Sequence, residues 1–249
     1  RSGRGHRGRR RPGFVRRLVS VVLAAGVVLV SLALAAVGYE LALPGVGDAQ
    51  ARVAAILRVH QGTIGGLPVP SKLGEAVVAV EDEHFYSDVF LNVFDGAARA
   101  AVASLHTSAP GGSTIPQQLA KQLYANTSSA SGAGATLEQI ALGVKLALSY
   151  SKAEILAMYL NAIYYGNGYW GDVSAARGYF GVDPEHLTWA EAAMLAGLPQ
   201  APSAYDPEEH LALAKLRQRH VLERLVANHF LTEGQADAAY AAPLPLRNE

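Results

Sequence analysis

Two carboxylates, Glu81 and Asp82, directly follow an apolar stretch, residues 76–80, that carries no charge. Acids at the edge of a hydrophobic core can have raised pKa values, and a general base needs a pKa near the working pH. A solvated helix end is the plain structural explanation for the same pair. The pair therefore marks a candidate site without deciding its chemistry.

A second polar segment, residues 111–121, reads Gly-Gly-Ser-Thr-Ile-Pro-Gln-Gln-Leu-Ala-Lys. Thr114 and Gln117 have the spacing of a helix capping box, and Pro116 falls in the first turn, where a missing N–H costs little. Capping does not explain the two glycines, the second glutamine or Lys121. Glycines before a helix N-terminus suit a site where backbone N–H groups meet phosphate. The segment therefore predicts a helix start that binds an anion.

A third polar segment, residues 149–161, begins Ser-Tyr-Ser-Lys and contains Ser151 and Glu154 at capping-box spacing. Ser149 and Lys152 match the Ser-x-x-Lys of penicillin-type acylation, but the Ser-Asp-Asn and Lys-Thr-Gly companions are absent, so we reject that chemistry. The eight His residues show no metal-ligand spacing, so we predict no metal site from protein side chains. The chain has no Cys, which excludes disulfides and thiol chemistry.

Together these segments resemble the family of glycosyltransferases that polymerise bacterial peptidoglycan. Penicillin-binding proteins contain the same activity. The string at 111–121 is highly specific, and Tyr159-Leu160-Asn161 and Phe85-Tyr86 extend the match. The resemblance covers about residues 67–242 and implies an all-α, lysozyme-like domain. It also implies inverting glycosyl transfer: the growing glycan on undecaprenyl pyrophosphate is the donor, lipid II is the acceptor, and undecaprenyl pyrophosphate leaves.

The resemblance also implies roles for individual residues. Glu81 is expected to be the general base that takes the proton from the C4 hydroxyl of the acceptor sugar. Gln139 stands at the place of a second essential Glu; it cannot ionise, and its spacing to Thr136 is that of a capping box. The expected substrate-binding residues are Asp82, Phe85, Arg99, Ser113, Thr114, Gln117, Gln118, Lys121, Lys152, Asn161 and Arg177.

The chain departs from the family pattern at Asp88, Phe90 and Asn92, where His, Gly and Asp are usual, and at Pro116, where Thr or Ser is usual. With Gln139, these departures motivate an alternative, a non-catalytic protein that binds lipid II or acts as a scaffold. A lysozyme-like hydrolase is a third reading, but it needs a second carboxylate. The resemblance further implies Mg²⁺ or Mn²⁺ as an aid that neutralises pyrophosphate, and cell-wall synthases as partners.

The elements that must position these residues are helices. Ser/Thr-x-x-Glu/Gln patterns predict five helix starts, at Thr114, Thr136, Ser151, Thr188 and Thr232. Gly197 and Pro199 predict the end of the helix that opens at Thr188, and residues 211–230 have an amphipathic helical pattern. A chain of 249 residues is long enough for one globular domain with a real core.

The N-terminal part has a different composition. Eight of the 21 Lys and Arg residues lie in residues 1–17, which leaves 13 basic against 21 acidic residues in the remainder. Such a basic tail favours an anionic surface, either nucleic acid or a membrane. Residues 18–37 form a stretch of twenty residues without charge, and as a helix they would rise about 30 Å, the thickness of the hydrocarbon core. We therefore predict a membrane and no nucleic acid.

The predicted organisation has four parts: a cytoplasmic tail (1–17), a transmembrane helix (18–39), a membrane-proximal linker (40–66) and the glycosyltransferase domain (67–242). The Arg excess before the apolar stretch places the N-terminus in the cytoplasm. We therefore expect a single-pass protein of the cell membrane whose catalytic domain is extracytoplasmic. A cleaved signal peptide is the alternative, with Ala33-Leu34-Ala35 as an acceptable cleavage triplet, although its apolar region is typically about 7–15 residues.

Overall fold

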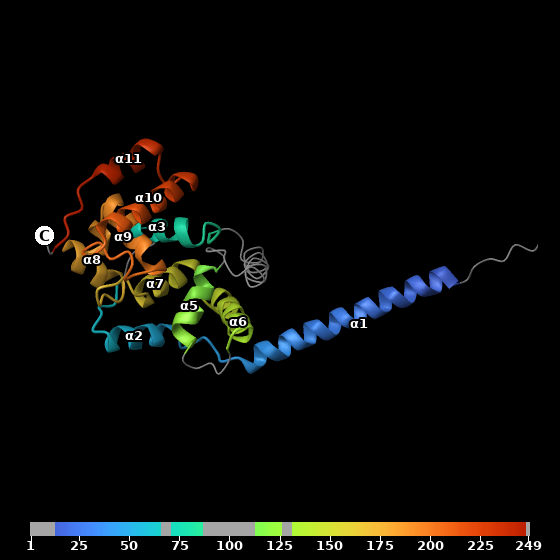
Figure 1. Cartoon of the computed structure of the whole chain (residues 1–249). Coiled ribbons are helices and arrows are strands. Elements are labelled where there is room, and N and C mark those ends of the chain that lie inside the picture. Colours follow the sequence, from blue (N-terminus) through green and yellow to red (C-terminus); the bar gives the residue numbers. More distant parts are fainter. Residues whose placement is uncertain (1–12, 66–70, 87–112, 126–130, 248–249) are drawn as a thin grey trace, which may run out of the picture. The chain divides into compact units, whose positions relative to one another are not determined.

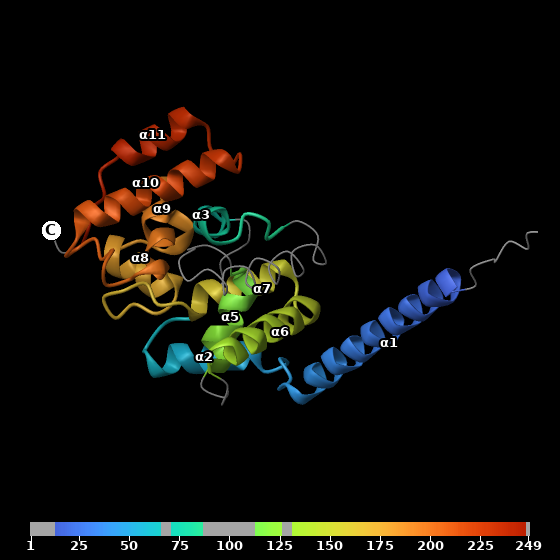
Figure 2. The same ribbon diagram turned by 45° about the vertical axis from the view of Figure 1, so that its right-hand side comes forward.

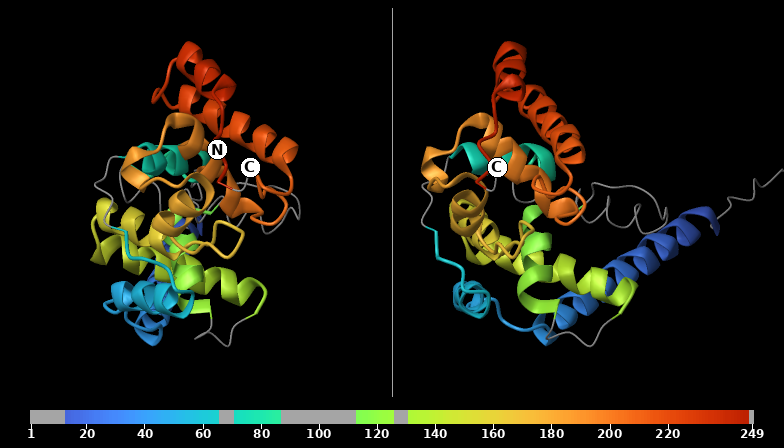
Figure 3. Two further views of the ribbon diagram at one scale, coloured as in Figure 1. Left: turned by 90° about the vertical axis from the view of Figure 1, so that its left-hand side faces the viewer. Right: turned by 60° about the vertical axis from the view of Figure 1, so that its left-hand side comes forward.

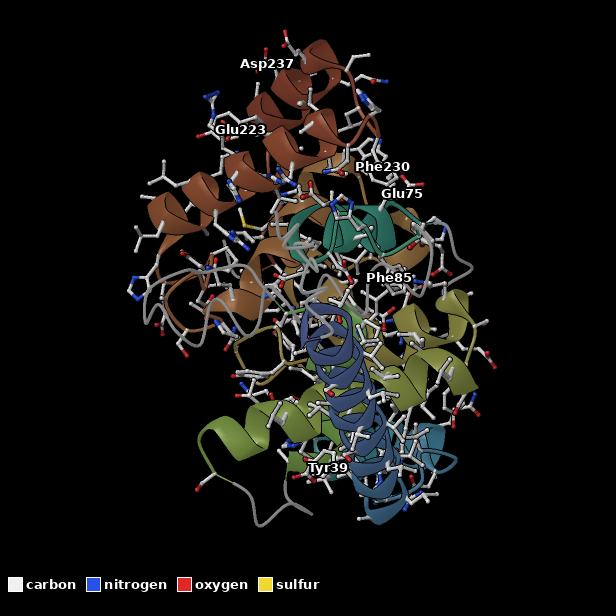
Figure 4. All side chains as sticks on the ribbon, turned by 90° about the vertical axis from the view of Figure 1, so that its right-hand side faces the viewer. Tyr39, Glu75, Phe85, Glu223, Phe230 and Asp237 are labelled. Atoms are coloured by element: carbon white, nitrogen blue, oxygen red, sulfur yellow. The ribbon has the colours of Figure 1, made fainter. Side chains whose placement is uncertain are left out.

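The computed structural model describes residues 13–65, 71–86, 113–125 and 131–247, and it divides the chain into two units at Pro44 and Gly45. The first unit contains helix α1 (Gly13–Ala42), on which Figure 4 labels Tyr39. Large apolar side chains along α1 are exposed: Leu18, Val19, Val21, Val22, Leu23, Val27, Val28, Val30, Leu34 and Val37. Among the helices of the described residues, none combines the length and the apolarity needed to cross a membrane.

The second unit is helical, as predicted (Figure 1). In the described part of this unit, the one β-type backbone pairing is an isolated antiparallel bridge between Tyr164 and Trp170. The helices are α2 (Ala49–Val59), α3 (Lys72–Glu81), α5 (Ile115–Tyr124), α6 (Ala133–Ser149), α7 (Lys152–Ala162), α8 (Asp172–Phe180), η2 (Pro184–His186), α9 (Trp189–Gly197), η3 (Leu198–Gln200), α10 (Leu211–Ala227) and α11 (Glu233–Ala241).

Four of the five predicted helix starts are confirmed. Complete capping boxes begin α5, α7, α9 and α11, at Thr114, Ser151, Thr188 and Thr232. The fifth prediction was wrong, because α6 begins a turn earlier, after Gly132, and Thr136 lies inside the helix. There the Thr136 hydroxyl donates to the carbonyl of Gly132. Gln139 is therefore not engaged in a cap.

One half of this unit is organised around α9. Residues 190–198 are all buried, and α10 packs with α3 and α9 on one side and α11 on the other (Figure 2). A buried Gln218 on α10 donates to the carbonyl of Ala190 at 2.7 Å, which joins the two helices. This packing fixes α10 beside the end of α3.

The other half holds α5 against α6 and α7, and α2 against α7 and α5. Helix α2 lies in the segment predicted as a linker, so the compact unit begins at Gly45, well before residue 67. Its attachment depends on side chains from distant parts of the chain: the Tyr124 hydroxyl donates to Asp48 at 3.0 Å, and Arg52 donates to the carbonyl of Leu123. In Figure 3, α2 and α11 lie at opposite ends of the unit.

Candidate active site

A cleft of about 1100 Å³ separates the two halves of the second unit. The end of α3, helices α5 and α6, the C-terminal end of α7 and one side of α10 all contribute to its lining. Figure 1 shows the course of these helices. Six of the residues expected at the site line it: Glu81, Ser113, Gln117, Gln118, Lys121 and Gln139. Residues far apart in the sequence therefore meet in one concave space of the size that ligand sites usually have.

Glu81 occupies the middle of this arrangement as the last residue of α3. Its Oε2 accepts a hydrogen bond from Gln118 Nε2 at 2.9 Å, and its Oε1 lies 3.7 Å from Nη2 of Arg217. The side chains of Glu81 and Arg217 are mostly buried, with exposed fractions of 16% and 12%. A carboxylate at a helix C-terminus is disfavoured by the helix dipole, and the facing guanidinium offsets that effect.

Arg217 was missed by the sequence analysis, because nothing in the pattern of α10 shows which residue faces α3. Its Nε donates to the carbonyl of Gly197 at 3.2 Å. A Cβ at Gly197 would lie 2.7 Å from Cγ of Arg217, so the small residue makes room for the arginine stem. Burial lowers the pKa of Arg217 from its very high ordinary value, and guanidinium remains charged at neutral pH.

Tyr159 was also missed: it belongs to a segment that matches the family but was not among the residues expected at the site. It is fully buried on α7, and its hydroxyl donates to Gln118 Oε1 at 2.8 Å. Burial and the charge of Glu81 raise the pKa of Tyr159 well above its usual value, so the hydroxyl keeps its proton. Because it donates to Oε1, the amide of Gln118 turns its Nε2 toward Glu81. Tyr159, Gln118 and Glu81 thus form one directed chain of hydrogen bonds.

Helix α5 brings several expected residues to the cleft at once. Ser113 and Lys121 are exposed there, whereas Gln117 is buried and its side chain accepts from the backbone N–H of Thr114. Asp82 reaches the same helix start, where its Oδ2 accepts from the N–H of Ile115 at 3.1 Å. The carboxylate suits the positive end of the α5 dipole. Asp82 therefore fixes the end of α3, and with it Glu81, against α5.

Four expected residues lie behind the cleft wall instead of in it. Asp82, Phe85, Thr114 and Lys152 line a separate small cavity. Lys152 donates to the carbonyl of Phe85, and its Nζ lies 4.8 Å from the centre of the Phe85 ring. Figure 4 labels Phe85. Burial lowers the pKa of Lys152, while the negative charge of Asp82 acts in the opposite direction. These residues hold the turn that follows Glu81.

Gln139 lines the cleft from α6, near Lys121 and Gln122 of α5. The helix that carries it starts at Ala133, so its position follows from the packing of α6 on α5. A Cβ at Gly143, one turn further on, would lie 3.0 Å from the backbone of Gln117. This close approach of the two helices brings Gln139 to the same wall as Lys121.

Two expected residues lie away from the cleft. Asn161 is buried and holds the segment between α2 and α3, because its side chain accepts from the N–H of Gly65 at 2.6 Å and donates to the carbonyl of Gly65. Arg177 is exposed and forms an ion pair with Asp183 at 2.5 Å. Neither is among the residues that line the cleft. Further predicted positions lie outside the described residues: Asp88, Phe90, Asn92, Arg99, Gly111 and Gly112.

The charges of the cleft are few. Among the described residues that line it, Glu81 supplies the one carboxylate, and Lys121 and Arg217 supply the cations. Burial and the charge of Arg217 lower the pKa of His220, which favours the neutral imidazole. One carboxylate already bonded to an amide does not form a ligand set for a divalent cation. Within the described parts of the chain, a group of residues that could hold one, Asp183, Glu185 and His186, lies elsewhere and includes the partner of Arg177.

The arrangement can accept a proton at Glu81 and stabilise negative charge at Lys121 within one cleft. Proton removal by a positioned base and stabilisation of a leaving anion are the two elements of a displacement on an activated sugar.

Comparisons with known proteins extend this description. The model of one protein family, described as Transglycosylase, matches residues 53–226. A Cupriavidus necator protein whose name describes it as a transglycosylase is 39% identical over 180 residues, 72% of this chain and 77% of that protein. Penicillin-binding protein 1A of Neisseria gonorrhoeae is 42% identical over 172 residues, 68% of this chain and 21% of that protein.

A crystal structure of penicillin-binding protein 1A from Haemophilus influenzae is similar at 24% identity and a TM-score of 0.45, over 74% of this chain and 18% of that one. The chain thus spans about a fifth of the penicillin-binding proteins it matches. The family match runs from α2 to the end of α10 and includes every described residue that lines the cleft.

Proposed function

Because this chain belongs to the transglycosylase family and is a peptidoglycan glycosyltransferase, we propose that it polymerises lipid II into glycan strands. The growing glycan on undecaprenyl pyrophosphate is the donor, and lipid II is the acceptor. The observation that carries the proposal is the position of Glu81, held by Gln118 beside Arg217 in a cleft that Lys121 also lines. The helical unit is expected to have the lysozyme-like architecture that the resemblance implies.

Glu81 acts as the general base in this proposal. It removes the proton from the C4 hydroxyl of the acceptor sugar as that oxygen forms a bond to the anomeric carbon of the donor. The hydrogen bond from Gln118 and the charge of Arg217 hold the carboxylate in one orientation before the proton arrives. A positioned base of this kind is typically worth about 10²–10⁴ in rate.

The bond between the anomeric carbon and the pyrophosphate oxygen breaks, and its electron pair stays on the leaving undecaprenyl pyrophosphate. Lys121 lies one turn along α5 from Gln117, on the same wall of the cleft as Ser113. An ammonium group stabilises the developing phosphate charge, whereas the positive end of the α5 dipole already faces the carboxylate of Asp82. We assign Lys121 to the leaving pyrophosphate.

Gln139 supports the substrate without changing its protonation state. Its amide can donate and accept hydrogen bonds from the wall that also carries Lys121. The described lining offers no second carboxylate to activate a water, which argues against the hydrolase alternative.

We also propose that α1 anchors the enzyme in the cell membrane, with the helical body extracytoplasmic. Two features support this: residues 18–37 carry no charge, and the apolar side chains listed above along α1 are exposed. Exposed apolar surface of this extent is characteristic of membrane or protein contact. An anchor would confine the enzyme to the surface that holds its lipid-linked substrates. Cell-wall synthases are the partners we expect there.

The test is polymerisation of labelled lipid II by the purified protein and by its Glu81→Gln variant. Glutamine keeps the size of the side chain but cannot take a proton, so we expect polymer formation to fall by about 10²–10⁴. Glu83→Gln is the matched control, because Glu83 is an exposed neighbour that pairs with Arg224 and does not line the cleft.

Equal polymer yields from wild type and Glu81→Gln would remove Glu81 from the role of base. Wild type that binds lipid II but forms no polymer, with Mg²⁺, with Mn²⁺ and without metal, would instead favour the non-catalytic alternative.

A further inference from the structure

Three aromatic side chains form a row that begins in the cleft, at the end of α7, and continues outside it. Tyr164 lines the cleft itself, close in sequence to Tyr159 and Ile163, which also line it. Its ring centre lies 5.1 Å from that of Trp170, and Trp170 stacks on His60 at 4.1 Å with 10° between the planes. We call Tyr164, Trp170 and His60 the aromatic row. It extends from the cleft to the end of α2.

The backbone holds the first two members of the row in place. Tyr164 and Trp170 form the antiparallel bridge, and the N–H of Tyr165 donates to the carbonyl of Tyr169 at 2.9 Å. The turn between them depends on Gly166, whose φ of 90° is unfavourable for residues with a side chain. The Tyr164 hydroxyl accepts from the N–H of Gly168. The two rings are therefore presented by a stiff turn.

The third member comes from another part of the chain. His60 follows directly on α2, and Gly62 brings the chain so close that a Cβ there would lie 2.9 Å from the carbonyl oxygen of Trp170. If all three rings were buried, packing in the core would be a sufficient reason for them to stack. Instead His60 is exposed, and Tyr164 and Trp170 are partly exposed. An open aromatic surface that continues a cleft is a feature that core packing does not require.

We propose that the aromatic row is a binding site for the neutral sugar rings of the glycan strand, continuing the cleft beyond the reacting sugars. Aromatic planes suit the apolar faces of hexose rings, while sugar hydroxyls remain in water. The cleft cations, Lys121 and Arg217, belong to α5 and α10 and not to this row. Because aromatic faces suit sugar rings better than pyrophosphate, we assign the row to sugar. The assignment of this sugar to a glycan strand rests on the proposed function.

Tryptophan fluorescence gives a direct test, because the chain has two tryptophans, Trp170 and Trp189. Trp189 is the first residue of α9 and lies outside the row, so Trp189→Phe leaves Trp170 as the single reporter in the full-length protein. The probe is the soluble tetrasaccharide of N-acetylglucosamine, which is uncharged and carries neither lipid nor pyrophosphate. We expect a saturable change in Trp170 emission as the tetrasaccharide is added.

In the same background, His60→Ala should weaken tetrasaccharide binding roughly three- to tenfold, since it removes one aromatic surface. Val59→Ala is the matched control, because Val59 is exposed at the neighbouring position and is not in the row. In polymerisation of lipid II, His60→Ala should also shift the products toward shorter chains.

The possible outcomes separate this inference from the proposed function. Unchanged Trp170 emission together with normal polymer length in His60→Ala would overturn the aromatic row as a sugar site while polymerisation stands. A saturable Trp170 response that His60→Ala weakens, in a protein that makes no polymer, would support the sugar site and contradict the polymerase.

Discussion

At the scale of single residues, the orientation of Gln118 depends on Tyr159. Without the hydroxyl, Gln118 Oε1 loses its donor, and the amide can turn so that an oxygen faces the Glu81 carboxylate. We expect Tyr159→Phe to lower the rate of lipid II polymerisation about tenfold, because the variant weakens the hydrogen bond from Gln118 to the charged Glu81. Tyr150→Phe is the control, since its hydroxyl donates to the carbonyl of Val46, away from the cleft. Equal rates for the two variants would contradict the directed chain of hydrogen bonds.

Asp172 is a second residue with a measurable consequence. It is fully buried, and neither carboxyl oxygen has a well-formed hydrogen bond to another of the described residues. Burial raises its pKa from 3.8 to about 6, although the nearby backbone N–H groups of Val173 and of Asp172 itself act in the opposite direction. The folded protein therefore binds this proton more tightly than the unfolded chain does. The stability associated with the neutral acid is fully present below about pH 4 and is lost as the pH rises through 6.

Asp172→Asn removes this ionisation. We expect the variant to unfold at higher denaturant concentration at pH 7–8, with a free energy of unfolding higher by up to about 3 kcal/mol. The difference should shrink toward pH 4. Asp237→Asn, an exposed change on α11 (Figure 4), serves as the control. Parallel stability curves for wild type and Asp172→Asn between pH 4 and 8 would disprove the raised pKa.

At the scale of elements, we expect the N-terminus of α5 to matter for activity in a way that the capped N-terminus of α11 does not. Thr114 begins the helix that carries Gln117, Gln118 and Lys121, whereas Thr232 begins α11, outside the cleft. Changing either threonine to alanine should lower the free energy of unfolding by about 1 kcal/mol, the usual value of a cap. We expect Thr114→Ala alone to reduce lipid II polymerisation as well. Chemical unfolding and the polymerisation assay, run on both variants, check this; equal activities would contradict it.

At the scale of the whole molecule, the two units differ in what they contribute. The body from Gly45 onward has its own buried core, so removal of residues 1–42 should leave its melting temperature unchanged. If α1 is an anchor, the shortened protein should no longer float with lipid vesicles and should polymerise vesicle-bound lipid II more slowly. Its rate on lipid II in detergent should stay close to that of the full chain. Undiminished flotation of the shortened protein would contradict the anchor.

The sequence by itself determined the features that depend on neighbours along the chain. A capping box joins residues three positions apart, so Thr114, Ser151, Thr188 and Thr232 could be predicted without a structure. Thr136 shows the limit of this local prediction, because α6 begins one turn earlier, after Gly132. The polar string at 111–121 likewise carried the resemblance to the family, and that resemblance implied which of its residues line the cleft.

Only the tertiary structure decided what meets Glu81. Arg217 and Tyr159 belong to amphipathic or buried helices, where the sequence shows that a residue packs but not against which partner. The same holds for α2, whose attachment through Asp48 and Tyr124 depends on a helix more than seventy residues away. Contacts of this kind are set by the packing of whole helices, and helical periodicity carries no information about the identity of the opposing face.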